Sequence, residues 1–473
     1  MIPRLELLLN HTLFVCLFSF RRGLQEHIEV ASKLLDHTLA RFPDGGLFLF
    51  IKGRLERLRR DLRASVACFM RSADMQTEFV QLQHLCYYEL GWSHFFLGEY
   101  GESLKYFGVL SVESEWSKAF YGYMKALCLL ELGDVAQAQQ LLLSLPDLVK
   151  RSFGGKTLSV EQFVVRKVTQ YVPQAGKDDR VSSSDGGGGG EGGSGGGGGG
   201  GSAAESFSVG GGDEGSVEVT GDSRSGVGSD GLVDRQGRRG EDQRASDDEG
   251  KDDADDEFVD ALSLNEDVAG SCPVGLVLPS LEVMYLWNGF TQFDRDLLMR
   301  ASGLVRSYMR DRGLDGDDAG SVSPPAGTPH AVANVGQDMD ERCVCKLLMG
   351  SLLKECGELA AAMACFQYIE AHSKHIRREL YVIPHARYER ASLLLLVYHM
   401  RRDGTPAAAA SAAMRPSATG IEVPATPGDE LKAIKTLLGK ASHFDKDYNF
   451  EVRLRVRIHL AMDKVNVLQA QAK

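Results

Sequence analysis

"GWSHFFLGEYGESLKYF", residues 91–107, contains the pattern that decides the fold. Gly91 is followed twelve positions later by a second small residue, Ser103, and four positions after that by the large apolar Phe107. Two antiparallel helices can cross closely only where neither side chain at the crossing is bulky. Between the two small residues, Gly98 is suited to end one helix and Glu99 to begin the next. The stretch therefore predicts two packed helices joined by a short turn.

The same pattern recurs along the chain. The further sets are Ser19, Ala31 and Leu35; Gly53, Ser65 and Phe69; Ala126, Ala138 and Leu142; Gly289, Ala301 and Val305; and Gly350, Ala362 and Phe366. In the first four sets in chain order, the leading small residues lie 34, 38 and 35 residues apart. A helix–turn–helix unit with a period of about 34 residues is typical of tetratricopeptide (TPR) repeats. The predicted fold is all-α, a TPR-like superhelix of helical hairpins interrupted by disordered inserts.

One segment also reads as a β-strand. Phe42 to Gly46 resembles a turn, and the apolar run Leu47 to Ile51 after it resembles a buried strand, as at the edge of a nucleotide-binding sheet. Gly53 inside this run begins one of the repeat sets, which favours a helix buried between neighbours.

Three stretches have a composition that cannot form a core. Residues 173–272 are rich in Gly, Ser, Asp and Glu, and residues 311–340 and 403–428 are similar. Such segments bury too little apolar surface to offset the entropy of ordering, so we expect them to be disordered. We expect helical repeats at 1–172, 273–310 and 341–402 and C-terminal helices at 429–473. Within these regions we predict helices at Leu158–Tyr171, Pro384–His399, Glu430–Phe444 and Phe450–Leu468.

Net charge and cysteine usage limit the partners and the compartment. The net charge of −12 argues against nucleic-acid binding, which needs a basic face. The 9 cysteines are scattered singly and no secretory signal is recognisable, which indicates a reducing cytosol. Leu5 to Phe20 is apolar, but Glu6 interrupts it and it falls short of the roughly 20 apolar residues of a spanning helix. We expect a buried helix there, with a membrane anchor as the alternative.

Several motifs resemble chemical sites without completing them. "SFGGKT", residues 152–157, ends like a phosphate-binding loop, but Lys150 stands where the motif needs a glycine and no strand precedes it. A second group comprises Cys343, Cys345, Cys356, Cys365, His372 and His375, and a third comprises His84, Cys86 and His94. Their spacings differ from those of zinc sites, so we predict packing or surface roles. We predict no catalytic residues, no cofactor and no metal, and hence no enzyme.

One aromatic set is a candidate binding surface. It consists of Tyr88, Trp92, Phe95, Phe96 and Tyr123, on what we expect to be the first helices of adjacent repeats. First helices line the concave face of a solenoid, where these side chains would form a peptide groove. The other interpretation, which helical spacing favours, is that they fill the interhelical core. The face is mostly apolar, so we do not expect a clamp for a partner's C-terminal carboxylate.

Longer stretches resemble a known family. They are "FPDGGLFLFIKGRLERL" (42–58), "HLCYYELGW" (84–92), "WSKAFYGYMKA" (116–126), "GGKTLSVEQFVVRK" (154–167), "LPSLEVMYLWNGF" (278–290) and "CVCKLLMGSLLKECGELAAAMACF" (343–366). They are similar to the tetratricopeptide repeat protein 39 family, which includes the fungal inclusion-body-clearance proteins. The chain resembles the C-terminal portion of its members, and the glycine-rich insert is foreign to the family pattern.

The resemblance implies a non-enzymatic adaptor or scaffold that binds other proteins and no nucleic acid. It also implies a mostly cytoplasmic location, with association with the nucleus, the mitochondrial outer membrane or lipid droplets. The implied roles are inclusion-body clearance and lipid-related or ciliary regulation. The alternative function is a membrane-associated structural protein of the mitochondrial surface or lipid droplets.

Overall fold

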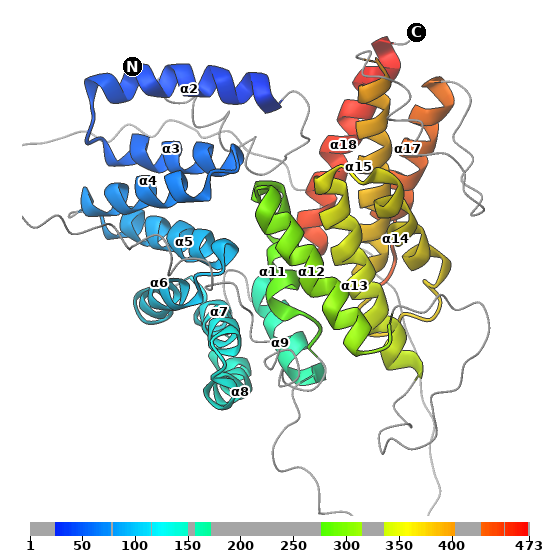
Figure 1. The fold of residues 1–473 in the computed structure, drawn as a ribbon, viewed down its shortest axis with the longest axis horizontal. Helices are drawn as coiled ribbons and strands as arrows, with labels where there is room; N and C mark the ends of the chain where they lie inside the picture. Colours follow the sequence, from blue (N-terminus) through cyan, green and yellow to red (C-terminus); the bar gives the residue numbers. More distant parts are fainter. Residues whose placement is uncertain are drawn as a thin grey trace, which may run out of the picture. The chain divides into compact units, whose positions relative to one another are not determined.

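The computed structural model describes residues 24–76, 79–114, 116–149, 157–171, 276–314, 335–402, 427–448 and 450–471. Within these ranges every regular element is a helix and no strand occurs. Helices that are neighbours in sequence pack against each other (Figure 1). The predicted all-α fold of TPR-like hairpins is therefore confirmed. The predictions for Leu5–Phe20, Ser19, most of "SFGGKT" and residues 173–272 lie outside the described residues.

The first hairpins follow one another along the chain. They are formed by α3 (Gly46–Leu58) with α4 (Leu62–Asp74), α5 (Val80–Leu97) with α6 (Tyr100–Glu113), and α7 (Lys118–Glu131) with α8 (Val135–Ser144). Helix α2 (Leu24–Arg41) packs on α3, and η1 (Leu145–Leu148) and α9 (Ser159–Tyr171) follow α8. Because α4 also contacts α5 and α6 contacts α7, each hairpin covers the apolar face of the next.

Close contacts at the small residues hold these hairpins together. A Cβ atom added at Gly53 would lie 2.7 Å from the Phe69 ring, and one at Gly91 would lie 3.0 Å from the Phe107 ring. The hydroxyl of Ser103 also donates a hydrogen bond of 2.9 Å to the Gly91 carbonyl. The twelve-residue spacing therefore marks a real contact, in which the absent side chain makes room for an aromatic ring.

The turns inside the hairpins need glycine. Gly98, Gly133 and Gly357 have φ angles of 79°, 83° and 89°, which residues with a side chain rarely adopt. Asp134 then caps α8 by accepting a hydrogen bond from the Gln137 amide. These residues lie where one helix ends and the next begins, as predicted for Gly98.

The segment with strand-like composition is helical. Leu47 to Ile51 lies within α3, where Leu49, Phe50 and Ile51 are all buried. Neighbouring helices on both sides of α3 explain why its apolar residues are continuous rather than confined to one stripe.

Residues 276–314 depart from the expected repeat. The chain forms the short helix α11 (Pro279–Leu286), the 3-10 turn η2 (Gly289–Gln292) and helix α12 (Arg295–Asp311). Asn288 has a φ of 62°, which ends the first helix early. A Cβ at Gly289 would meet the Phe96 ring at 2.7 Å and the Met284 carbonyl at 2.9 Å. Gly289 therefore does not make the helix-pair contact with Ala301 and Val305 that its spacing predicts.

The remaining helices are α13 (Val335–Cys356), α14 (Leu359–Ala371), α15 (Val382–Arg402), α17 (Pro427–Ser442) and α18 (Glu451–Gln471). The predicted contact recurs between α13 and α14, because a Cβ at Gly350 would lie 2.7 Å from the Phe366 ring. Helix α13 begins at Val335, inside the segment 311–340 that we expected to be disordered, and α17 begins at Pro427, just inside 403–428. The described helices extend into both expected inserts at their edges.

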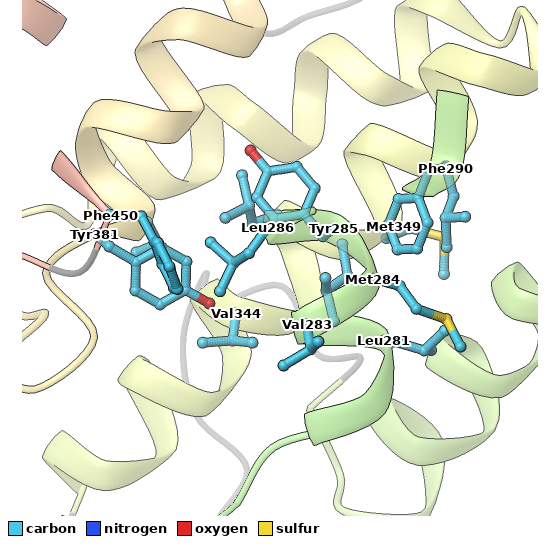
Figure 2. Packing of buried hydrophobic residues seen from close by; sticks show 14 of the residues in the cluster. Leu281, Val283, Met284, Tyr285, Leu286, Phe290, Val344, Met349, Tyr381 and Phe450 are labelled. Carbon is cyan, nitrogen blue, oxygen red and sulfur yellow. The ribbon is translucent and has the colours of Figure 1, made fainter. Parts of the chain in front are cut away.

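Helix α11 lies inside the main core. All eight of its residues are buried. Figure 2 shows its side chains between Tyr381 and Phe450 on one side and Phe290 and Met349 on the other. A helix that is apolar all round needs partners on every face, and these come from segments far apart in the sequence.

Two networks of buried polar side chains connect these segments. Lys167 of α9 lies 2.6 Å from a carboxylate oxygen of Glu282 and 2.5 Å from one of Glu379, and each of the three side chains is at most 3% exposed. Near it, His385 Nδ1 lies 3.0 Å from the Tyr285 hydroxyl. Burial, with the nearby charge of Arg457, lowers the pKa of His385 from 6.5 to about 3. His385 is therefore neutral in the folded protein.

We expect Gly91→Leu to destabilise the fold, because its side chain would occupy the space of the Phe107 ring. Overpacking of this kind costs roughly 1–3 kcal/mol. Gly101, on the partner helix of the same hairpin, has no atom within 4 Å of an added Cβ, so Gly101→Leu is the matched control. Thermal unfolding followed by circular dichroism compares the two variants. Equal melting temperatures for both would show that the contact has been misassigned.

The stability of the protein should fall in acid because of His385. The unfolded state takes up a proton below pH 6.5, whereas the folded state resists protonation down to about pH 3. Stability is therefore lost as the pH falls below 6.5, by about 2 kcal/mol between pH 7 and pH 5. The Tyr285 hydroxyl contacts the imidazole ring, and the charge of Arg457 acts on it. Glu389 accepts a hydrogen bond from the same Tyr285 hydroxyl. Urea unfolding should show this slope as the difference between the wild type and His385→Gln, because Glu131 and Glu282, whose pKa values burial raises to about 7, contribute slopes of the opposite sign in both proteins.

His459 provides the control for this measurement, since its side chain is 79% exposed. His459→Gln should keep the wild-type pH dependence. A slope that His385→Gln leaves unchanged would contradict the assignment.

Candidate binding pocket

The five aromatic residues of the candidate groove lie mostly in the core. Trp92, Phe95, Phe96 and Tyr123 are at most 4% exposed, and Tyr88 is half-buried. Phe95 and Tyr123 are completely covered, so they do not line a groove. In this set the structure favours packing over an open binding surface.

The chain itself covers this aromatic surface. Trp287, directly after α11, stacks on Trp92 with ring centroids 5.0 Å apart and on Phe120 at 4.8 Å. Phe293 packs edge-on against Phe96 at 5.7 Å. The segment that contains Trp287 and Phe293 therefore covers aromatic side chains of helices α5 and α7.

A pocket lies beside these aromatic side chains. It is a pocket of about 100 Å³, which we call the arginine–tryptophan pocket. Its lining residues are Arg54, Arg57, Leu58, Tyr88, Glu89, Trp92, Phe96, Trp287, Gln292 and Arg453. They come from α3, α5, the segment after α11, and α18.

Positive charge exceeds negative charge in the lining. Arg54, Arg57 and Arg453 face a single carboxylate, Glu89. Arg57 pairs with Glu89, and Arg54 Nε lies 3.6 Å from the same carboxylate. The carboxylate of Glu89 is thus shared by two of the three arginines, Arg54 and Arg57.

Arg453 is the arginine that remains. Its guanidinium lies 4.7 Å from the centroid of the Trp287 ring, and its Nη1 donates to the Leu286 carbonyl at 3.4 Å. Among the described residues no carboxylate lies within ion-pair distance of it. Burial, with the charge of Arg457 one turn away, lowers the pKa of Arg453 to about 10. This guanidinium therefore carries a charge that the described protein does not neutralise.

Further buried polar atoms at the pocket lack hydrogen-bond partners among the described residues. They include Nη1 of Arg57, Nε1 of Trp92 and Oε1 of Gln292. Tyr88 is fixed differently, because its hydroxyl accepts a hydrogen bond of 2.9 Å from Trp287 Nε1. The pocket thus offers cationic donors, one acceptor and flat aromatic walls.

The cysteine and histidine groups have structural roles in the described chain. Cys343 and Cys345 are buried, and burial raises the pKa of the Cys343 thiol to about 12. His94 lies 2.6 Å from Glu99, across the turn between α5 and α6, and His84 lies 3.1 Å from Glu113. No group of three or more His, Cys, Asp or Glu residues suited to a metal was found in the described ranges.

Sequence reasoning named Tyr88, Trp92 and Phe96 of the pocket lining but none of its arginines. It expected a mostly apolar face, whereas the structure places Arg54, Arg57 and Arg453 there. One signal was available: Arg54 and Arg57 lie one turn apart in a helix that is otherwise rich in buried apolar residues. Arg453 carries no such signal, because only the folded chain brings α18 beside α3 and α5.

The comparison with known families agrees with the resemblance seen in the sequence. Residues 1–184 match the model of the Iml2/Tetratricopeptide repeat protein 39 family. The resemblance is confirmed over this part of the chain, which includes the α3 and α5 side of the pocket. In the described residues, none of the helices has the length and apolar character needed to span a bilayer.

Trp287→Ala should loosen the segment that covers the aromatic surface. The change removes both stacked ring pairs, each worth roughly 0.5–1.5 kcal/mol beyond burial. We expect backbone amides of α11 and η2 to exchange hydrogen about tenfold faster or more, since about 1.4 kcal/mol corresponds to a factor of ten. Hydrogen–deuterium exchange mass spectrometry measures these exchange rates. Trp116→Ala, at a tryptophan that is 47% exposed, is the control and should leave these amides protected.

Proposed function

We propose that the protein is a non-enzymatic scaffold that binds a segment of another protein at the arginine–tryptophan pocket. The observation that carries this proposal is the pocket itself, an opening lined by aromatic side chains with excess positive charge. TPR-like repeats of the matched family support protein interaction in general. Tyr88, Trp92 and Phe96 are the members of the predicted aromatic set that would contact the partner.

The state of the buried titratable groups supports a binding role over catalysis. Burial raises the pKa of the Cys86 and Cys128 thiols to about 11 and 12, which disfavours the reactive thiolate. His385 is neutral and enclosed by Tyr285 and Tyr381. Lys167 is held between two carboxylates. These groups stabilise the core and are not presented to a substrate.

The family resemblance supports a narrower version of the proposal. In it the partner belongs to inclusion-body clearance or lipid-related regulation. The protein would act in the cytoplasm, with peripheral association with the mitochondrial outer membrane or lipid droplets. The pocket itself requires only a protein segment with a group that suits its charge.

Photo-crosslinking from the pocket tests this function. A benzoylphenylalanine residue at Leu58, which lines the pocket, should crosslink to one short segment of a partner in cells. The same residue at Val467, which is 55% exposed on α18, should not. Gln292→Phe, which would fill the pocket, should abolish the crosslink. Equal labelling from Leu58 and Val467, or labelling that survives Gln292→Phe, would refute binding at this pocket.

A further inference from the structure

We infer that the arginine–tryptophan pocket recognises the side-chain carboxylate of an Asp or Glu in the partner segment, with Arg453 as its ion-pair partner. This inference rests on the proposed function and specifies the chemistry of the ligand. Its basis is the contrast between Arg453, which is partly buried, and other buried or partly buried cations.

Several buried cations of this protein already have carboxylates. Lys167 has Glu282 and Glu379, Lys354 has Glu389, and Arg57 has Glu89. The carboxylate nearest to Arg453 along α18, Glu451, lies 2.5 Å from the exposed Arg455 instead. A partly buried charge without a counter-ion costs free energy, because the contact with the Trp287 ring and the hydrogen bond to the Leu286 carbonyl replace only part of its hydration. A carboxylate from a partner would remove this cost.

Arg457 adds to the local positive potential. It is 9% exposed, lies one turn after Arg453 on α18, and lowers the pKa of Arg453. In the described residues Arg457 has no carboxylate within ion-pair distance either. The region of α18 next to the pocket therefore favours an anion more strongly than Arg453 alone would.

The size of the pocket limits the ligand. A single water needs roughly 10–15 Å³ of comparable volume, so about 100 Å³ holds a group of several heavy atoms. A carboxylate with its methylene groups fits this size, with the methylenes against Trp92 and Trp287. The planar guanidinium of Arg453 matches a carboxylate with two parallel hydrogen bonds.

The remaining donors and acceptors indicate a peptide rather than a free anion. Arg57 Nη1 provides a second N–H donor for the carboxylate. Gln292 Oε1 is an acceptor, which a bare anion would repel and a backbone N–H beside the acidic residue would satisfy.

Peptide selection followed by matched synthetic peptides tests the inference. A library of random 12-residue peptides displayed on phage is selected against the full chain. Selected sequences should share an Asp or Glu at a fixed position. The peptide with Glu→Gln at that position should bind the wild-type protein at least tenfold more weakly in fluorescence anisotropy.

Variants on α18 provide the matched comparison. Arg453→Met should weaken binding of the Glu peptide at least tenfold and leave binding of the Gln peptide unchanged. Arg455→Met, whose side chain is 57% exposed two residues away, should bind like the wild type. The Glu and Gln peptide pair uses only the wild-type protein, so it remains decisive if Arg453→Met fails to fold.

The outcomes separate the two levels of the proposal. Suppose a peptide crosslinks to the benzoylphenylalanine at position 58, and its Glu and Gln forms bind equally well. This result would refute recognition of a carboxylate but not the proposed scaffold function. A phosphoserine peptide that binds tenfold tighter than the Glu peptide would also refute recognition of a carboxylate. If no selected peptide crosslinks to the pocket, the proposed function fails and the inference fails with it.

Discussion

The structure depends on the contact between a glycine on one helix and a phenylalanine ring on the next. At Gly53, Gly91 and Gly350 the missing side chain is replaced by the ring of Phe69, Phe107 or Phe366. This contact fixes how closely each pair of helices crosses, and the turn glycines fix where each pair reverses. A hairpin formed in this way still has an exposed apolar face, so stability comes only when the next hairpin covers it.

The same requirement explains why the predicted peptide surface is filled. Helices α5 and α7, each the first of its hairpin, carry the aromatic residues Trp92, Phe96 and Phe120. Their partner helices α6 and α8 do not cover all of this apolar surface. Trp287 and Phe293 cover it from a segment almost two hundred residues further along the chain. Gly289 lets this segment approach, because a side chain there would collide with Phe96. Aromatic packing on this face therefore serves the fold first, and the proposed binding pocket lies beside the covered side chains.

The sequence predicted the helical hairpins because their determinants are local. A glycine, a small residue twelve positions on and a phenylalanine four positions later are all read within one unit. It failed at Gly289, where the pattern is present but Asn288 ends the helix and the contact comes from Phe96 instead. The charged part of the pocket could not be predicted for a similar reason. Arg57 and Arg453 are far apart in sequence, and nothing in either segment indicates that the two side chains meet in the fold. Local periodicity specifies pairs of helices, whereas the site depends on which pairs meet.

Because its walls come from α3 and α18, the pocket exists only while these helices are held in place. An ion pair and a ring contact hold these helices. Arg60 of the α3–α4 turn lies 2.6 Å from Glu355 of α13. The rings of Trp287 and Phe450 are 5.1 Å apart. In the packed state Arg453 contacts Trp287 and the Leu286 carbonyl but has no carboxylate partner among the described residues, and its pocket is formed only when α18 is packed. A ligand that neutralises Arg453 would therefore bind the assembled state alone and stabilise it by mass action, by about 2.7 kcal/mol at a hundred times its dissociation constant. In such a scaffold the partner and the packing of α18 are thermodynamically linked, and each strengthens the other.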